Sequence, residues 1–323
     1  MSPIRLGGLL GHESILKLIF QQKENCDIDE PDSNGRTALI WASEYGHEKV
    51  VQILLDAGAD INAQDKWYTT ALQAASKGGH EKTVQILLDA GADVNAQGVY
   101  MNALQAASKG GHEKTVQILL DAGADVNAQG GKFRTALQAA SERGHEKIVQ
   151  ILLDAGADIN AQGGPYNTAL QAASYHGEKG VQILLNKGAD VNAQGGYAGS
   201  PLSAASFSSN ETVVQMLLDA GADVNAQGGE LGNALQAAVS SEDSDETVVQ
   251  ILLDAGPDVN AQGGFYGNAL EAASYHGNET VVQILLDAGA DVNAPGRHYG
   301  NALEAALKGG HEKAVRMLRE KMP

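Results

Sequence analysis

Apolar positions recur along this chain with helical spacing, in segments that return about every 33 residues. In the segment EKTVQILLDAG, Val84, Leu87 and Leu88 stand at positions i, i+3 and i+4, which line one face of a helix. Gly91 follows them, and glycine tolerates the left-handed backbone that ends many helices. The shorter segment ALQAAS comes earlier, with Thr70 in the N-cap position. The pattern therefore predicts two short helices followed by a glycine-rich turn.

The position that opens the first helix recurs with steps of 32 to 35 residues, which is typical of a repeat protein. The Gly-His pair after Pro3 matches the Gly-His pair after Ala38, so Pro3 begins an earlier copy and the chain holds ten. We predict an all-α repeat solenoid that forms one domain over residues 1–323. An N-terminal capping repeat would cover 1–37, internal repeats 38–301 and C-terminal capping helices 302–323. The openings after Pro3 are Ala38, Ala71, Ala103, Ala136, Ala169, Pro201, Ala234, Ala269 and Ala302.

Neither helix of a copy is long enough to bury its apolar face alone, so neighbouring copies must stack into a continuous core. The small residues Ala74 and Ala75 recur in most copies and permit close helix packing. In the last copy Arg319 replaces a leucine, as expected for a polar outer cap. In the first copy Gly7 and Gly8 replace the small Ala/Ser pair, which predicts a frayed first helix.

The segment GRTALIWASEYGHEKVVQILLDAGADINAQD, residues 35–65, resembles the ankyrin repeat, and the resemblance covers essentially the whole chain. It implies helix-turn-helix repeats with short β-hairpin fingers, and a concave face of hairpin tips and first helices that usually contacts a partner. The NALQAAS and NAQGG variants resemble arrays of filamentous fungi. One departure is that Gln, or Glu at Glu271 and Glu304, replaces the family's histidine. The family is mainly a binding scaffold, so the resemblance does not identify a partner.

The formal net charge of −18 argues against sequence-independent nucleic-acid binding and against anionic membranes. Cys26 is the only cysteine, so no intrachain disulfide is possible. No stretch of 18 apolar residues occurs, and the first twenty residues do not read as a signal peptide. We expect an intracellular protein, in the cytoplasm, with the nucleus left open.

Candidate chemical sites have simpler structural interpretations. Six of the nine histidines share the turn between the two helices, where Gly-His is a familiar structural pair. His176 and His276 lie three repeats apart, too far to share a metal. Glu271 and Glu304 more simply replace the glutamines of other copies, and Asn210 and Asn278 read as helix caps. We therefore expect no catalytic residue, metal or cofactor.

Two sets of positions vary while the rest of each copy is constant, and they point to a partner. One set is the residue pair that ends the first helix, such as Tyr175-His176. The other lies three or four residues before each helix opening and holds most of the aromatic residues. A regular row of Tyr residues in this second set could equally pack against neighbouring hairpins. The candidate partner-binding residues are Trp67, Tyr68, Tyr100, Phe133, Arg134, Tyr166, Tyr175, His176, Tyr197, Phe207, Phe265, Tyr266, Tyr275, His276, His298 and Tyr299.

Our leading functional hypothesis is a non-enzymatic scaffold that binds a protein or peptide on its concave face. One alternative is that the chain is the recognition part of a larger receptor, because it also resembles the ankyrin tails of fungal nucleotide-binding, immune-type proteins. Another is a small-molecule binder or enzyme that uses a groove in the array, with Arg134 among its polar groups.

Overall fold

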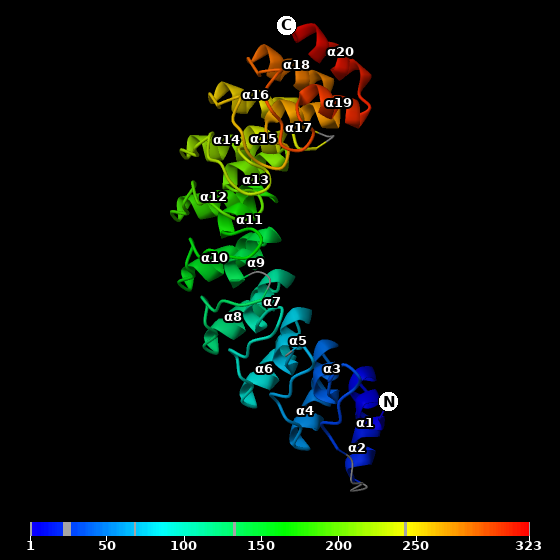
Figure 1. Ribbon diagram of the computed structural model, residues 1–323. Helices are drawn as coiled ribbons and strands as arrows, with labels where there is room; N and C mark the ends of the chain where they lie inside the picture. Colours follow the sequence, from blue (N-terminus) through cyan, green and yellow to red (C-terminus); the bar gives the residue numbers. More distant parts are fainter. Residues whose placement is uncertain (1, 22–26, 68, 132–133, 242–243, 323) are drawn as a thin grey trace. The chain divides into compact units, whose positions relative to one another are not determined.

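Each repeat folds as two helices joined by a short turn, as the apolar pattern predicts (Figure 1). The computed structural model describes residues 2–21, 27–67, 69–131, 134–241 and 244–322, and twenty helices in ten pairs lie in these ranges. The predicted all-α repeat architecture is confirmed. The chain divides into two compact units, unit 1 (Met1–Asp158) and unit 2 (Ile159–Pro323).

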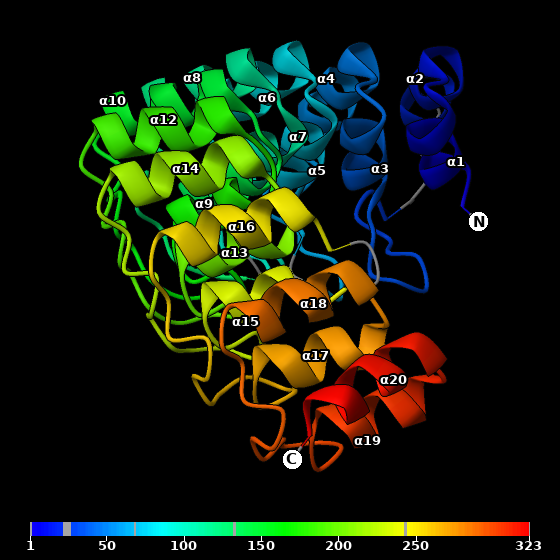
Figure 2. The same cartoon turned by 90° about the horizontal axis from the view of Figure 1, so that it is seen from above.

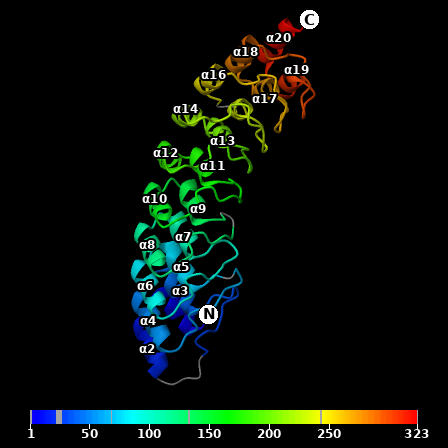
Figure 3. The same cartoon turned by 90° about the vertical axis from the view of Figure 1, so that its left-hand side faces the viewer.

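Unit 1 holds five pairs, whose first helices pack in one row and whose second helices pack in another. The hairpins that connect successive pairs leave the side of the first-helix row (Figure 3). The first helices are α1 (Pro3–Leu10), α3 (Ala38–Glu44), α5 (Ala71–Gly78), α7 (Ala103–Gly110) and α9 (Ala136–Glu142). The second helices are α2 (Glu13–Gln21), α4 (Glu48–Asp56), α6 (Glu81–Asp89), α8 (Glu113–Asp121) and α10 (Glu146–Asp154).

Unit 2 holds the other five pairs in the same two-row arrangement (Figure 2). Its first helices are α11 (Ala169–Ser174), α13 (Pro201–Phe207), α15 (Ala234–Ala238), α17 (Ala269–His276) and α19 (Ala302–Gly309). Its second helices are α12 (Glu178–Asn186), α14 (Glu211–Asp219), α16 (Glu246–Asp254), α18 (Glu279–Asp287) and α20 (Glu312–Lys321).

Small residues let the first helices approach closely, and they form much of the core. Ala75 and Ala107 have no exposed surface in the first helices, and neither does Leu87 in a second helix. The predicted fraying of the first helix is wrong, because α1 is continuous from Pro3 to Leu10. Gly8 explains the difference, since a Cβ atom there would meet the backbone of Ala38. The glycine permits a close approach that holds the helix in place.

The first helices are capped as the sequence predicts. Thr70 Oγ1 accepts the backbone N–H of Gln73 at 3.3 Å, and Gln73 Oε1 accepts the backbone N–H of Thr70 at 3.0 Å. This reciprocal capping box also forms at α7, α9, α11 and α15. Asn210 and Asn278 cap α14 and α18 through their side-chain oxygens, which confirms their assignment as helix starts.

Two kinds of side-chain hydrogen bond join consecutive repeats, one a ladder of turn histidines in unit 1 that His311 repeats once in unit 2, the other a ladder of hairpin asparagines in both units. The turn histidines form one, in which His80 Nε2 lies 2.9 Å from the carbonyl oxygen of Glu44 and His112 Nε2 lies 3.0 Å from that of Lys77. Hairpin asparagines form the other, as when Asn95 Oδ1 accepts the backbone N–H of Asp125 at 2.8 Å. The structural interpretation of the turn histidines is confirmed.

Candidate binding surface

The hairpins and first helices of unit 2 bring together eleven of the aromatic and histidine residues selected from the sequence. We call these residues the aromatic surface. They come from five successive repeats, and each reaches the surface from a hairpin or from the end of a first helix. The aromatic surface consists of Tyr166, Tyr175, His176, Tyr197, Phe207, Phe265, Tyr266, Tyr275, His276, His298 and Tyr299.

Tyr175 is the centre of one ring cluster. Its ring lies 5.4 Å from that of Tyr166 and 6.4 Å from that of Phe207, both in edge-on arrangements that aromatic pairs favour. Tyr175 and Phe207 also pack against a buried apolar group that includes Ala198 and Leu231. Tyr175 is therefore half-buried and packs against the core, whereas Tyr197, which lines the same pocket, is 51% exposed.

The hydroxyl group of Tyr175 is buried, and none of the described residues offers it a hydrogen-bonding partner. Burial raises the pKa of Tyr175, and the neighbouring Tyr166 and Tyr197 raise it further. The phenol is therefore neutral throughout the physiological range. An unpaired buried hydroxyl lowers stability, so this contact reflects a compromise between packing and polarity.

A second cluster of six rings lies where the last two hairpins of unit 2 meet the end of α17. Tyr275 and Tyr299 stack with their ring centroids 4.6 Å apart and their planes within 8°. Phe265 and His298, on successive hairpins, are 4.1 Å apart. Tyr266 lies 5.7 Å from Tyr275 and so completes the connection between the hairpins and α17. The Tyr row thus packs here against its own neighbours, one of the two roles that the sequence left open.

Hydrogen bonds fix the polar edges of this second cluster. Tyr266 Oη lies 2.8 Å from His276 Nε2. Burial raises the pKa of Tyr266, and a hydrogen bond with Tyr275 raises the pKa of Tyr299 to about 12. The phenols of Tyr266 and Tyr299 are consequently neutral near pH 7 and offer hydroxyl groups and ring faces, with no charge.

Two pockets open between the rings, and Tyr197 lines both. The tyrosine pocket has a volume of 460 Å³ and is lined by Pro165, Tyr166, Tyr175, His176 and Tyr197. The glutamate pocket has a volume of 500 Å³ and is lined by Tyr197, Phe207, Glu230, Leu231, Ser240, Phe265 and Tyr266. Glu230 is not among the binding residues predicted from the sequence. The one sequence feature that could have indicated a binding role for Glu230 is its position, since it lies four residues before a helix opening, as Tyr197 and Phe265 do in neighbouring repeats.

Backbone hydrogen bonds hold the rims of the glutamate pocket in register. The N–H of Glu230 donates to the carbonyl oxygen of Tyr197 at 2.9 Å, and the N–H of Phe265 donates to that of Glu230 at 2.8 Å. These three residues therefore stand side by side on consecutive hairpins. Tyr197, Glu230 and Phe265 therefore follow one another along the rim in that order.

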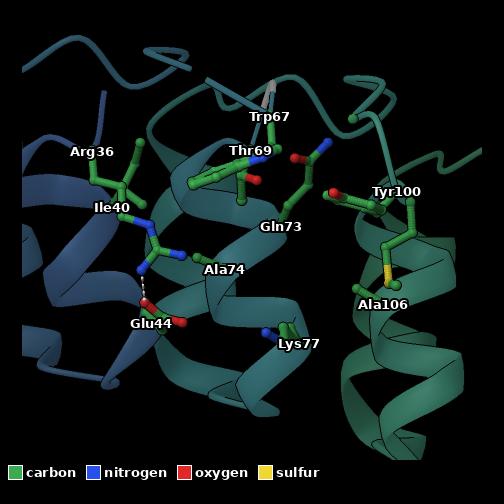
Figure 4. Close-up of a pocket in the computed structure, with 12 residues that line it drawn as sticks. Arg36, Ile40, Glu44, Trp67, Thr69, Gln73, Ala74, Lys77, Tyr100 and Ala106 are labelled. Atoms are coloured by element: carbon green, nitrogen blue, oxygen red, sulfur yellow. Dashed lines mark hydrogen bonds and ion pairs between the residues drawn. The ribbon is translucent and has the colours of Figure 1, made fainter. Parts of the chain in front are cut away.

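Unit 1 has a separate pocket of 420 Å³ that holds two of the selected residues, Trp67 and Tyr100. Figure 4 shows their rings on either side of the Gln73 side chain. Arg36 lies in the wall of the pocket. Its Nη1 donates to Glu44 Oε2 at 2.7 Å, and its guanidinium lies 4.7 Å from the Trp41 ring, so residues of the fold itself pair with its charge. The pocket is a second, smaller candidate site.

Arg134, another selected residue, does not join these sites. Arg134 is exposed on a hairpin, where its backbone has a positive φ of 66°, and its side chain hydrogen-bonds to Gln129 at 3.1 Å. Tyr68 and Phe133 lie outside the described residues.

Glu271 replaces the glutamine of other repeats by reversing its hydrogen bonds. Gln236 Nε2 donates to carbonyl oxygens of the following hairpin, including that of Ala261 at 2.9 Å. The fully buried Glu271 carboxylate instead accepts the backbone N–H groups of Arg297 at 3.0 Å and Tyr299 at 2.8 Å. The prediction that Glu271 replaces the glutamine of other repeats is confirmed. The hairpin that follows it presents backbone N–H groups in place of carbonyl oxygens.

Neither a metal centre nor a membrane span is indicated in the ranges that the structure describes. No group of three or more His, Cys, Asp or Glu side chains there is arranged to hold a metal ion. Across the same residues, every helix is too short or too polar to pass through a bilayer.

Comparison with known proteins identifies the repeat. The family model described as "Ankyrin repeats (3 copies)" matches residues 9–65, 62–130, 98–163, 162–228 and 235–322. A mouse protein named "Ankyrin repeat and SAM domain-containing protein 6" is 34% identical over 61 residues. That match covers 19% of this chain and 7% of the mouse protein, so the chain spans only a small part of this relative.

Proposed function

Because the chain belongs to the ankyrin-repeat family, whose repeats are generally protein-interaction modules, we propose that it binds a protein partner through the aromatic surface of unit 2. The observation that carries the proposal is the pair of adjacent pockets that share Tyr197. Exposed rings beside pockets supply large contact areas with few rotatable bonds, as binding hot spots do. The proposed role requires no chemical step, and we place the protein inside the cell.

Within the aromatic surface, the exposed rings are the proposed contacts and the half-buried rings are their support. Tyr197 and Phe265 are 51% and 42% exposed, so a partner can cover them. Tyr175 and Phe207 pack against the buried core beneath them. This division decides which substitutions test binding, since alanine at Tyr175 or Phe207 would also remove packing.

A site-specific crosslinking experiment tests the proposal. The photoreactive residue p-benzoyl-phenylalanine would replace Tyr197, or as a control Gln215, which is exposed on α14 of the neighbouring second-helix row. In lysate of the source cells we expect a protein that crosslinks at position 197 and not at position 215. Purified, that protein should bind the Tyr197→Ala/Phe265→Ala variant at least tenfold more weakly than the unaltered chain. Crosslinks of equal yield at both positions, or unchanged affinity, would contradict the proposal.

A further inference from the structure

The central part of the aromatic surface, from Tyr197 to His276, lies in a long stretch of the chain whose charged Asp, Glu, Lys and Arg residues are all acidic. Between Gly188 and Gly296 the sequence contains fifteen Asp and Glu residues and no Lys or Arg. Tyr197, Glu230 and Phe265 all fall within this stretch. A surface of one sign attracts partners of the other sign and raises their rate of encounter. The charge therefore selects a basic partner from among the proteins that the aromatic surface could contact.

The glutamate pocket has the composition that a buried cation requires. Four of its seven lining residues are aromatic, namely Tyr197, Phe207, Phe265 and Tyr266, and Glu230 supplies the one carboxylate. No lysine or arginine is among these lining residues. Ring faces attract cations within about 6 Å of their centres, and a carboxylate provides the opposite charge. A cation entering this pocket would not have to displace a positive group of the chain.

Backbone pairing places Glu230 between Tyr197 and Phe265 on three consecutive hairpins. Glu230 is joined to Tyr197 on one side and to Phe265 on the other by the hydrogen bonds of the hairpin backbones. A planar guanidinium can lie against a ring face and at the same time donate two hydrogen bonds to a carboxylate. An ammonium group is more strongly hydrated and lacks the flat shape that stacks on a ring.

We propose that the glutamate pocket recognises an arginine side chain of a basic protein segment, held between the rings of Tyr197 and Phe265 and paired with Glu230. This inference rests on the proposed binding role of the aromatic surface and names the chemistry of its partner. The tyrosine pocket next to it would accept a neighbouring apolar or aromatic side chain of the same segment, because three tyrosine rings and Pro165 line most of it.

Fluorescence polarisation with a labelled (Gly-Ser-Arg)₄ peptide and the full chain tests the proposal. A peptide with citrulline in place of arginine has nearly the same shape and no charge, and a third peptide carries lysine. We expect the arginine peptide to bind at least tenfold more tightly than the citrulline peptide and at least threefold more tightly than the lysine peptide. Equal binding of the arginine peptide and either of the others would overturn the assignment of a guanidinium site.

A pair of charge-matched variants separates the pocket from general attraction. Glu230→Gln removes the pocket carboxylate, whereas Asp219→Asn removes one exposed carboxylate at the end of α14. We expect Glu230→Gln to weaken binding of the arginine peptide at least fivefold and Asp219→Asn to weaken it less than twofold. Equal losses in the two variants would show that net charge alone attracts the peptide, and the pocket would have no part in it.

The outcomes distinguish this inference from the proposed function on which it rests. A partner that crosslinks at position 197 while the three peptides bind alike would refute the arginine site and leave the scaffold role standing. Selective binding of the arginine peptide that depends on Glu230 supports the site directly, whichever protein supplies the segment.

Discussion

Two tyrosine-to-phenylalanine substitutions in unit 2 should change stability in opposite directions. Each removes a single hydroxyl and keeps the ring. In Tyr175→Phe the lost hydroxyl is buried and has no partner among the described residues. In Tyr266→Phe the lost hydroxyl is the one that lies 2.8 Å from His276 Nε2. The pair therefore isolates hydrogen bonding from ring packing.

The expected magnitudes follow from the cost of burying polar groups. A buried hydroxyl without a partner costs about 1–3 kcal/mol, so Tyr175→Phe should raise the free energy of unfolding by about 1 kcal/mol. A formed hydrogen bond contributes about 0.5–1.5 kcal/mol net, so Tyr266→Phe should lower the free energy of unfolding by a similar amount. Tyr100 is exposed, and Tyr100→Phe should leave stability unchanged within about 0.5 kcal/mol.

Urea unfolding of the full chain, followed by circular dichroism, measures these differences. With a slope of about 2–3 kcal/mol per molar urea, a change of 1 kcal/mol moves the midpoint by about 0.3–0.5 M. Hydrogen exchange of unit 2 amides would localise the change to the repeats around each tyrosine. A Tyr175→Phe variant that unfolds at lower urea than the unaltered chain would refute the reasoning, since it would mean that the hydroxyl makes a stabilising bond.

Three further predictions concern the hydrogen bonds that join repeats and the titration of a buried phenol. Glu271→Gln should lower the free energy of unfolding by about 1–3 kcal/mol, because an amide donor would face backbone N–H groups. Gln236→Glu should lower it by a similar amount, because a carboxylate would face backbone carbonyl groups. Thermal unfolding of each variant measures these losses, and the double variant shows whether they add. Asn102→Ala should cost about 1 kcal/mol in urea unfolding because it removes a helix cap, and Asn102→Ser should restore most of it. Because folding raises the pKa of Tyr175, stability should be fully present below about pH 10 and fall as pH rises above it; a Tyr175→Phe variant whose midpoint falls just as steeply would contradict this.

The repeat architecture was predictable because it depends on local patterns that recur ten times. The N-cap of Thr70 and the turn position of His80 follow from residue type and spacing, and the structure confirms both. The reversed bonding of Glu271 was not predictable, because it depends on how the following hairpin turns its N–H groups. The match between the Glu271 carboxylate and the N–H groups of the following hairpin cannot be predicted from the sequence of either segment alone.

The roles of individual aromatic residues were the hardest to predict from sequence. Tyr175 and Tyr197 have the same chemistry and both lie at variable positions, yet one is half-buried and the other is 51% exposed. The difference arises from Phe207 and the small core residues of the next repeat, which cover Tyr175. Glu230 could not be predicted for a similar reason, since its proposed binding role depends on the aromatic residues that line the same pocket.

The uniform ladder bonds bear on how such a gene can lengthen or shorten. Most internal repeats offer the same hairpin asparagine oxygen to the repeat that follows, so unequal recombination between their coding copies would add or delete a whole repeat and leave the bonds of the asparagine ladder satisfied. The junction after Glu271 is an exception, because its carboxylate fits only a hairpin that presents N–H groups, as the one with Arg297 does. A copy inserted there would face carbonyl groups instead. Natural variants of this array should therefore differ in repeat number among the internal copies and keep the last two repeats together.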